Sequence, residues 1–285
     1  MIEVIKTGMF LSIQDLGRSD YTSFGVPQSG VMDRYASKFA NLIIGNKEND
    51  AVIETTSGHS VLKFHQETVL CVSGAEVVVS INDMSVKQNK ALKIGQNDIL
   101  KIRTPTTGFR SYIAVQGGIQ TEIQFGSRSM YQPITSSSYL IKGDTIPIKT
   151  FKEKDVSKGA TVRFDASYLR TNSIDAYPGP EYTELSKEQQ NKLLNTSFAI
   201  SANSNRMGIR LIERIPNQLK PIVTSLVLPG TVQLTPDGTL IVLMQDAQTT
   251  GGYPRILQLT DVAMNTLAQK KFGTQIQFNI ISQTT

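Results

Sequence analysis

Short apolar runs separated by turn-forming residues recur along the sequence, and they constrain the fold more than any other feature. Runs of a few residues bounded by glycine, proline, asparagine or aspartate are typical of the strands of an all-β protein. The run Val77–Asp83 ends in a turn pair that predicts a hairpin. The candidate strands are Ile2–Lys6, Ser60–Phe64, Thr68–Val72, Val77–Ile81, Asp98–Arg103, Ser111–Val115, Thr161–Phe164, Phe198–Ser201, Thr231–Leu234, Leu240–Met244 and Gln275–Asn279.

Helical spacing of apolar residues is confined to a few short segments. Asp33–Gly45 places its apolar side chains on one helical face, with Asp33 as a candidate N-cap and Gly45 as a candidate stop. Leu185–Leu194 and Thr260–Lys271 are predicted to be the other helices. We therefore expect an all-β protein with a few short helices, and the strand pattern fits a barrel or a sandwich.

Charge and hydropathy exclude several classes of partner. The net charge is +5, but basic residues are scattered among acidic ones, and no Lys/Arg run alternates with aromatics as in single-strand binding. No window approaches the ~18 apolar residues of a membrane span, and the N-terminus lacks a secretory signal pattern. We expect a soluble cytoplasmic protein with no nucleic-acid and no membrane partner.

Nucleophile and metal chemistry have few candidate residues. Cys71 is the single cysteine and lies in a strand-like run, which favours a buried and inert thiol. The two histidines, His59 and His65, form no metal-binding pattern, so we expect no metal. Gly-x-Ser-x-Gly and the phosphate-binding loop Gly-x-x-x-x-Gly-Lys-Ser/Thr are both absent.

The stretch Asp246–Pro254 combines a carboxylate, two threonine hydroxyls, two glycines and a tyrosine directly after the apolar run Leu240–Met244. Glycines at the end of a strand let a ligand or another backbone approach closely, and the polar side chains supply donors and acceptors. The same residues are common in plain turns, so both interpretations stay open. The candidate site residues of this stretch are Asp246, Thr249, Thr250 and Tyr253.

A second polar loop lies near the N-terminus. Arg18 can hold a carboxylate through two parallel hydrogen bonds, and Asp15 can orient Arg18 or receive a proton, with Gln14 beside them. An internal ion pair that fixes the loop is an equal alternative. Ser29 offers a free hydroxyl in the following loop, and Glu54 is expected to be either paired with a basic residue or functional.

Arg206 and Arg210 stand four positions apart, and on a strand they would face the same side. Arg206 is a candidate for binding an anion together with donors of the Asp246 loop. The alternative is structural, with Arg210 paired to Glu213 or Asp246.

Several ordered motifs carry a resemblance to a known family. They are Ser12–Arg18, Phe24–Asp33, Ala36–Asn46 with Ala51–Glu54, Asn203–Leu211 and Leu228–Gln233, together with the Asp246 loop. This set resembles the KipA-like, biotin-dependent carboxyltransferase family, also known as the allophanate hydrolase subunit 2 family, over nearly the whole chain. Ordered motifs of this length are far more specific than a lone glycine pattern.

The resemblance implies a cyclophilin-like β-barrel architecture with two related halves. We expect an N-terminal β-barrel half over residues 1–145 and a C-terminal cyclophilin-like half over residues 146–285. The mixed-charge stretch Gly143–Ala160 is the expected boundary.

The resemblance also implies a function in a complex. We expect the C subunit of an ATP-dependent 5-oxoprolinase, which opens 5-oxoproline or a related lactam or amide to glutamate. Its partners would be a KipI-like B subunit plus a larger A subunit. ATP would act in the assembled complex, and the isolated chain would be inactive.

Two alternatives follow from the same resemblance. One is the carboxyltransferase half of a biotin-dependent urea or amide carboxylase, although no biotin-carrier lysine motif occurs in the sequence. The other is a non-enzymatic KipA-like regulator that binds a KipI-like kinase inhibitor.

We expect the candidate residues to converge on one pocket for a small amide substrate, because rigid barrels present ligand-binding residues on loops at strand ends. In this hypothesis Asp15, Arg18 and Asp246 are catalytic. The substrate-binding residues would be Gln14, Ser29, Arg206, Thr249, Thr250 and Tyr253.

Overall fold

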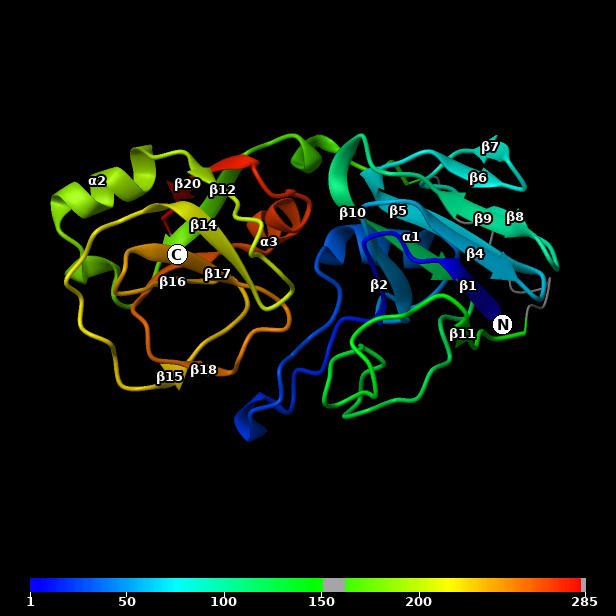
Figure 1. The fold of residues 1–285 in the computed structure, drawn as a ribbon, viewed down its shortest axis with the longest axis horizontal. Helices are drawn as coiled ribbons and strands as arrows, with labels where there is room; N and C mark the ends of the chain where they lie inside the picture. Colours follow the sequence, from blue (N-terminus) through cyan, green and yellow to red (C-terminus); the bar gives the residue numbers. More distant parts are fainter. Residues whose placement is uncertain (151–161, 283–285) are drawn as a thin grey trace. The chain divides into compact units, whose positions relative to one another are not determined.

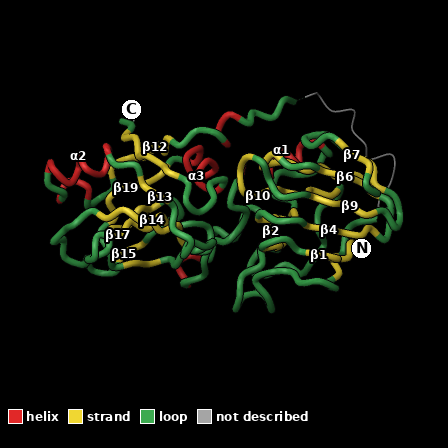
Figure 2. Tube along the Cα trace, turned by 45° about the horizontal axis from the view of Figure 1, so that its top comes forward, coloured by secondary structure: helices red, strands yellow, loops and turns green. Residues whose placement is uncertain are grey.

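The computed structural model describes residues 1–150 and 162–282. Strands dominate the described chain and three α-helices accompany them, which confirms the predicted all-β class with a few short helices (Figures 1 and 2). The chain forms two compact units. Unit 1 comprises Met1–Arg18 and Ser29–Arg170, and unit 2 comprises Ser19–Gln28 and Thr171–Thr285.

The expected domains, residues 1–145 and 146–285, stay a prediction, because a compact unit is not by itself a domain that folds independently. The expected linker Gly143–Ala160 lies largely outside the described residues. The first residue of the expected strand Thr161–Phe164 lies outside them too, and the described residues 162–164 form no strand, so that prediction is wrong for them.

Unit 1 contains two antiparallel sheets whose facing sides enclose an apolar core that includes Val4, Leu62, Leu70 and Ile113. The order β11-β1-β4-β9-β6-β7 forms one sheet and β2-β3-β10-β5-β8 the other. Their strands are β1 (Ile2–Lys6), β2 (Phe10–Gln14), β3 (Val52–Thr56), β4 (Ser60–Phe64), β5 (Thr68–Glu76), β6 (Val79–Ile81), β7 (Met84–Val86), β8 (Leu92–Ile94), β9 (Ile99–Ile102), β10 (Thr107–Val115) and β11 (Thr145–Ile146).

The predicted hairpin is present between β6 and β7. Asn82 and Asp83 both adopt positive φ angles, +49° and +66°. This is the backbone conformation that a two-residue type I′ turn requires, and asparagine and aspartate tolerate it better than most residues.

Helix α1 (Arg34–Ile43) packs on the outer side of β10 and β5 (Figure 1). As predicted, Asp33 caps it, accepting a hydrogen bond from the Ala36 N–H at 3.0 Å. Its buried side chains form a second apolar cluster with Cys71, Tyr112 and Ala114 of the sheet.

The segment that follows the undescribed residues returns to α1. Phe164 stacks on Tyr35 with a centroid distance of 5.2 Å, and the Tyr168 hydroxyl donates to Asp33 Oδ2 at 2.6 Å. Arg170 forms an ion pair with Glu76 of β5. These contacts explain why unit 1 extends to Arg170.

Unit 2 is a seven-stranded, barrel-like sheet in the order β13-β20-β12-β19-β16-β17-β14, with a separate two-stranded ribbon, β15-β18. A bridge between Ile200 and Leu211 links the two ends of the sheet, so the barrel is nearly closed. The strands are β12 (Ser173–Pro178), β13 (Phe198–Ala199), β14 (Gly208–Arg214), β15 (Ser225–Leu226), β16 (Thr231–Leu234), β17 (Thr239–Leu243), β18 (Thr250–Gly251), β19 (Arg255–Leu259) and β20 (Gln275–Ile280).

Each of the two helices of unit 2 begins directly after a polar capping residue. Helix α2 (Lys187–Asn195) carries a capping box formed by Ser186 and Gln189. Helix α3 (Asp261–Ala268) is capped by Thr260 and ends three residues before the predicted Lys271. It packs on β12, and α2 packs on β20 (Figure 1).

Candidate functional site

Asp15 follows β2 directly and is the centre of a buried hydrogen-bond cluster in unit 1. Its Oδ1 accepts from the Gly17 N–H at 2.8 Å and from the hydroxyls of Ser127 and Ser129 at 2.5 and 2.7 Å. Its Oδ2 accepts from the Arg128 N–H at 2.7 Å. An ionised carboxylate offers about four lone-pair sites, so these contacts use most of the acceptor capacity of Asp15 and saturate Oδ1. The geometry favours a role in holding the loop Gln124–Met130.

Arg18 holds the same loop through two of its backbone carbonyls. It is 2% exposed, and its Nη2 donates to the Ser129 carbonyl at 2.6 Å while its Nε donates to the Gln124 carbonyl at 3.4 Å. Gln14 Nε2 donates to the Met130 carbonyl at 3.2 Å. Gln14 Oε1 is buried and has no hydrogen-bond partner among the described residues. It is therefore a buried acceptor left unsatisfied by the described residues.

The loop of Ser29 lies against the loop of Asp15. Gly30 has a φ of +98°, and a Cβ added to it would lie 2.9 Å from the Gly17 nitrogen, so this close approach requires glycine. The Val31 N–H donates to the Asp15 carbonyl at 2.8 Å. Ser29 is fully buried, and its Oγ lacks a hydrogen-bond partner within the described part of the chain.

Glu54 is paired with a basic residue, Arg110, which is one of the two expectations stated for it. Its Oε1 lies 3.9 Å from Arg110 Nε, and its Oε2 accepts from the Met32 N–H at 2.8 Å. The Asp33 N–H donates to the nearby Tyr112 hydroxyl at 2.8 Å. Burial, followed by the charges of Glu54 and Asp33, raises the pKa of Tyr112 well above its usual value. This phenol is therefore a structural hydrogen-bonding group.

In unit 2, Arg206 and Asp246 form a bidentate ion pair. Arg206 Nε donates to Oδ2 at 2.8 Å and Nη2 donates to Oδ1 at 3.1 Å, and both side chains are about nine-tenths buried. The prediction that Arg206 and Arg210 face the same side is wrong, because β14 begins only at Gly208 and Arg210 is exposed. Asp246 is therefore paired with Arg206 and not with Arg210. Glu213 accepts a hydrogen bond from the Ala199 N–H.

The loop after Asp246 leads into β18, which pairs with the earlier strand β15 to form the two-stranded ribbon β15-β18. The Thr249 carbonyl accepts from the Val227 N–H at 3.0 Å, and Thr250 pairs with Leu226. Thr249 is buried, Thr250 is exposed and Tyr253 is 40% exposed. Thr250 and Tyr253 can therefore meet a ligand or a partner from solvent, whereas Thr249 fixes the ribbon.

Two glutamines near this loop were not identified as site residues from the sequence. Gln233 is 1% exposed, and its Nε2 would lie 2.4 Å from a Cβ added to Gly251, so the glycine makes room for the amide. Gln245 is 3% exposed and directly precedes Asp246. Gln233 Nε2 and Gln245 Oε1 both lack a hydrogen-bond partner among the described residues. The adjacency of Gln245 to Asp246 was the available sequence signal.

A second bidentate pair, between Glu181 and Arg255, was also missed. Arg255 Nη2 donates to Oε1 at 2.8 Å, and Nε and the Arg255 N–H donate to Oε2 at 3.0 and 2.7 Å. The hydrogen bond from Arg255 lowers the pKa of Glu181. Arg255 Nη1 also donates to the Leu226 carbonyl at 3.2 Å, so this pair supports the ribbon β15-β18.

The candidate residues thus form two groups, each within one compact unit. Unit 1 holds Gln14, Asp15, Arg18 and Ser29, and unit 2 holds Arg206, Asp246, Thr249, Thr250 and Tyr253. The convergence of both groups on one pocket stays a prediction.

The described residues contain no cluster of three or more histidine, cysteine or acidic side chains placed to bind a metal ion. Burial raises the pKa of Cys71 to about 12, consistent with an inert thiol. Within residues 1–150 and 162–282, no helix has the length and apolar character to cross a membrane.

Comparison with known proteins extends the motif resemblance. The chain is 34% identical to the C subunit of 5-oxoprolinase from Escherichia coli (strain K12), over 98% of this chain and 90% of that protein. It is 27% identical to urea amidolyase of Lachancea kluyveri over 98% of this chain, but spans only 17% of that protein.

A solved structure shares the fold. The crystal structure of the K. lactis urea amidolyase superposes with a TM-score of 0.87 at 28% identity, covering 99% of this chain and 19% of that chain. The family described as "Carboxyltransferase domain, subdomain A and B" matches residues 24–280. The chain therefore belongs to this carboxyltransferase domain family.

Proposed function

We propose that this chain is the C subunit of an ATP-dependent 5-oxoprolinase that opens 5-oxoproline to glutamate, with a KipI-like B subunit plus a larger A subunit. The observation that carries the proposal is the similarity to the Escherichia coli C subunit, which extends over nearly all of both chains. In the assembled complex, ATP activates the amide oxygen and water opens the ring.

The site chemistry of unit 2 suits an amide ligand. A lactam presents one carbonyl acceptor and one N–H donor. Gln233 Nε2 supplies an unpartnered donor and Gln245 Oε1 an unpartnered acceptor near the Asp246 loop, so these two amides complement the lactam. Thr250 and Tyr253 of the same loop are exposed to solvent.

In this proposal the charged residues play different parts. Asp15 and Arg18 are positioning residues, because their polar atoms hold the loop Gln124–Met130. Arg206 and Asp246 are bound to each other in a bidentate ion pair. If this pair loosens, Arg206 would bind the substrate carboxylate and Asp246 would accept or donate a proton. Among the candidate residues of unit 1, Gln14 and Ser29 each contribute a buried side-chain oxygen with no hydrogen-bond partner in the described chain.

The test is reconstitution. The chain is co-purified with its partner subunits, and glutamate release from 5-oxoproline is measured with and without ATP. We expect ATP-dependent release by the complex and none by the isolated chain. A complex that contains every subunit yet leaves 5-oxoproline unchanged would contradict the proposed substrate.

A second candidate is the carboxyltransferase half of a biotin-dependent urea or amide carboxylase. The similarity to urea amidolyase over nearly the whole of this chain favours it. Co-purification of a biotinylated protein and urea-dependent ATP hydrolysis by the complex would support it over the first. Stable binding of a KipI-like protein with no turnover of either substrate would indicate a regulator.

A further inference from the structure

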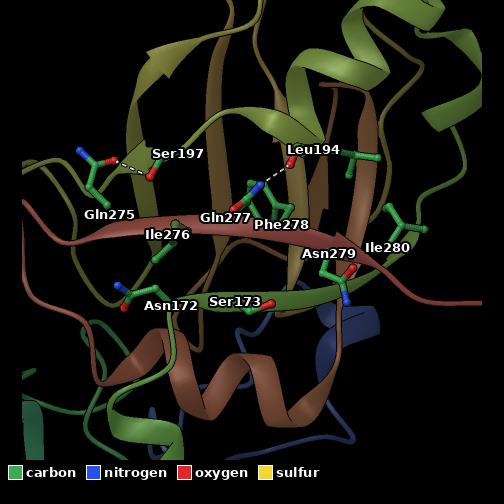
Figure 3. A pocket seen from close by; sticks show the side chains of 10 residues that line it. All are labelled: Asn172, Ser173, Leu194, Ser197, Gln275, Ile276, Gln277, Phe278, Asn279 and Ile280. Carbon is green, nitrogen blue, oxygen red and sulfur yellow. Dashed lines mark hydrogen bonds between the residues drawn. The ribbon is translucent and has the colours of Figure 1, made fainter.

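A groove of about 540 Å³ runs along β20 in unit 2 (Figure 3). Amide and hydroxyl side chains dominate its lining, and the described residues that line it carry no charge. None of the candidate residues of the Asp246 loop belongs to it. The polar lining side chains are Asn172, Ser173, Ser197, Gln275, Gln277 and Asn279.

The two edges of β20 are paired unequally. On one side β12 pairs in parallel with the whole of Gln277–Ile280. On the other side β13 is only two residues long and reaches only Gln275 and Ile276. In the described chain no strand pairs with Gln277–Ile280 on that second side. The last part of β20 is therefore an open edge.

The alternation of backbone hydrogen bonds along β20 identifies which backbone groups face this edge. The N–H groups of Gln277 and Ile281 donate toward β12, to the carbonyls of Asn172 and Ala176, both at 3.0 Å. Successive residues of a strand direct their backbone groups to opposite edges. The N–H and C=O groups of Phe278 and Ile280 therefore point toward the open edge.

The end of α2 forms the far wall of the groove. Gln277 Nε2 donates to the Leu194 carbonyl at 2.8 Å, and Ser197 Oγ donates to Gln275 Oε1 at 3.1 Å (Figure 3). These contacts bridge β20 and the chain that leaves α2. The groove lies between this wall and β20.

We propose that the open edge of β20 binds, in the manner of an added strand, an extended and uncharged segment from one of the partner subunits. An exposed strand edge is satisfied best by another extended backbone, and main-chain hydrogen bonds then supply the affinity. The neutral amide and hydroxyl lining selects a small polar segment and gives no charge-based attraction. The inference rests on the proposed function in one respect, because it takes the occupant from the partner subunits of the complex.

The test measures hydrogen exchange of the β20 backbone in the isolated chain and in the complex with its partner subunits. We expect the amides of Phe278 and Ile280 to exchange at least about tenfold more slowly in the complex, because added hydrogen bonds protect them. Unchanged exchange at both positions in a stable complex would overturn the inference.

Two variants separate backbone from side-chain recognition. Ile280→Pro removes an edge-facing N–H and no hydrogen bond to β12, and edge strands tolerate proline in this orientation. It should weaken partner binding by at least about tenfold while the fold, followed by circular dichroism, is retained. Asn279→Ala removes a lining side chain but leaves the edge-facing N–H groups of β20 in place, so it should weaken partner binding less than Ile280→Pro does. An equal loss in both variants would overturn strand addition.

The remaining outcomes are also decisive. Protection that grows with the concentration of the isolated chain, together with a dimeric mass, would identify a second copy as the occupant and overturn the partner assignment. Protection in a complex that leaves 5-oxoproline unchanged would support the docking edge and contradict the proposed function.

Discussion

The substitution Asp15→Asn tests whether Asp15 positions a loop or takes part in chemistry. Three of its hydrogen bonds reach Oδ1 and one, from the Arg128 N–H, reaches Oδ2. Asparagine can keep its oxygen at the Oδ1 position, but its Nδ2 then faces the Arg128 N–H. Two donors meet there, and the hydrogen bond from Arg128 is lost. Losing a hydrogen bond to a charged group costs about 1.5–3 kcal/mol, and an unpaired buried donor costs about 1–3 kcal/mol. Because these two costs overlap, we expect the free energy of unfolding to fall by about 2–4 kcal/mol.

Urea unfolding followed by circular dichroism measures this change. Asp20→Asn is the matched control, because Asp20 is exposed and bonds only weakly to Ser19, and it should change stability by less than about 0.5 kcal/mol. A variant Asp15→Asn with native stability but no turnover in the complex would refute the positioning role and indicate a catalytic one.

Three further predictions concern unit 2 and the thiol of unit 1. Asp246→Asn leaves the buried Arg206 without its bidentate partner and should lower the unfolding free energy by about 3–5 kcal/mol, and native stability in urea would show that the pair is dispensable. Because Arg255 lowers the folded-state pKa of Glu181, this pair contributes stability above the unfolded carboxyl pKa of about 4.3. That stability is lost as the pH falls through the lowered folded-state pKa of Glu181. Glu181→Gln should therefore reduce the fall of the unfolding free energy at acidic pH, and an unchanged fall would contradict the stabilising role of the pair. Cys71, whose pKa burial raises to about 12, should react with iodoacetamide at pH 8 only after unfolding, and rapid labelling of the native protein would contradict its burial.

Local elements of the fold were predictable because their causes are local. Asp33 lies where its side chain accepts the N–H of Ala36 three residues on, so the start of α1 could be read from the sequence. The Asn82-Asp83 turn likewise carries its own conformational preference.

The partners of the candidate residues were not predictable, since they come from distant parts of the chain. Asp15 binds Ser129, which is 114 residues away, and Arg206 binds Asp246, which is 40 residues away. The sequence placed Asp15 near Arg18, and only the fold shows that the two side chains hold the same loop through Ser129.

The extension of unit 1 to Arg170 has a similar origin. Phe164 and Tyr168 follow a mixed-charge stretch that suggests a linker, yet both pack on α1 through Tyr35. A single sequence shows the aromatic residues but not the surface that receives them.

The most direct test of the central claim is an omission assay with the purified components of the complex. Partner subunits, 5-oxoproline and ATP are mixed with and without this chain, and glutamate and ADP are measured together. We predict that both products form in step only when this chain is present and that the chain alone forms neither. Glutamate formation at the same rate without the chain, or no glutamate from the complete mixture, would contradict its assignment as the C subunit of a 5-oxoprolinase.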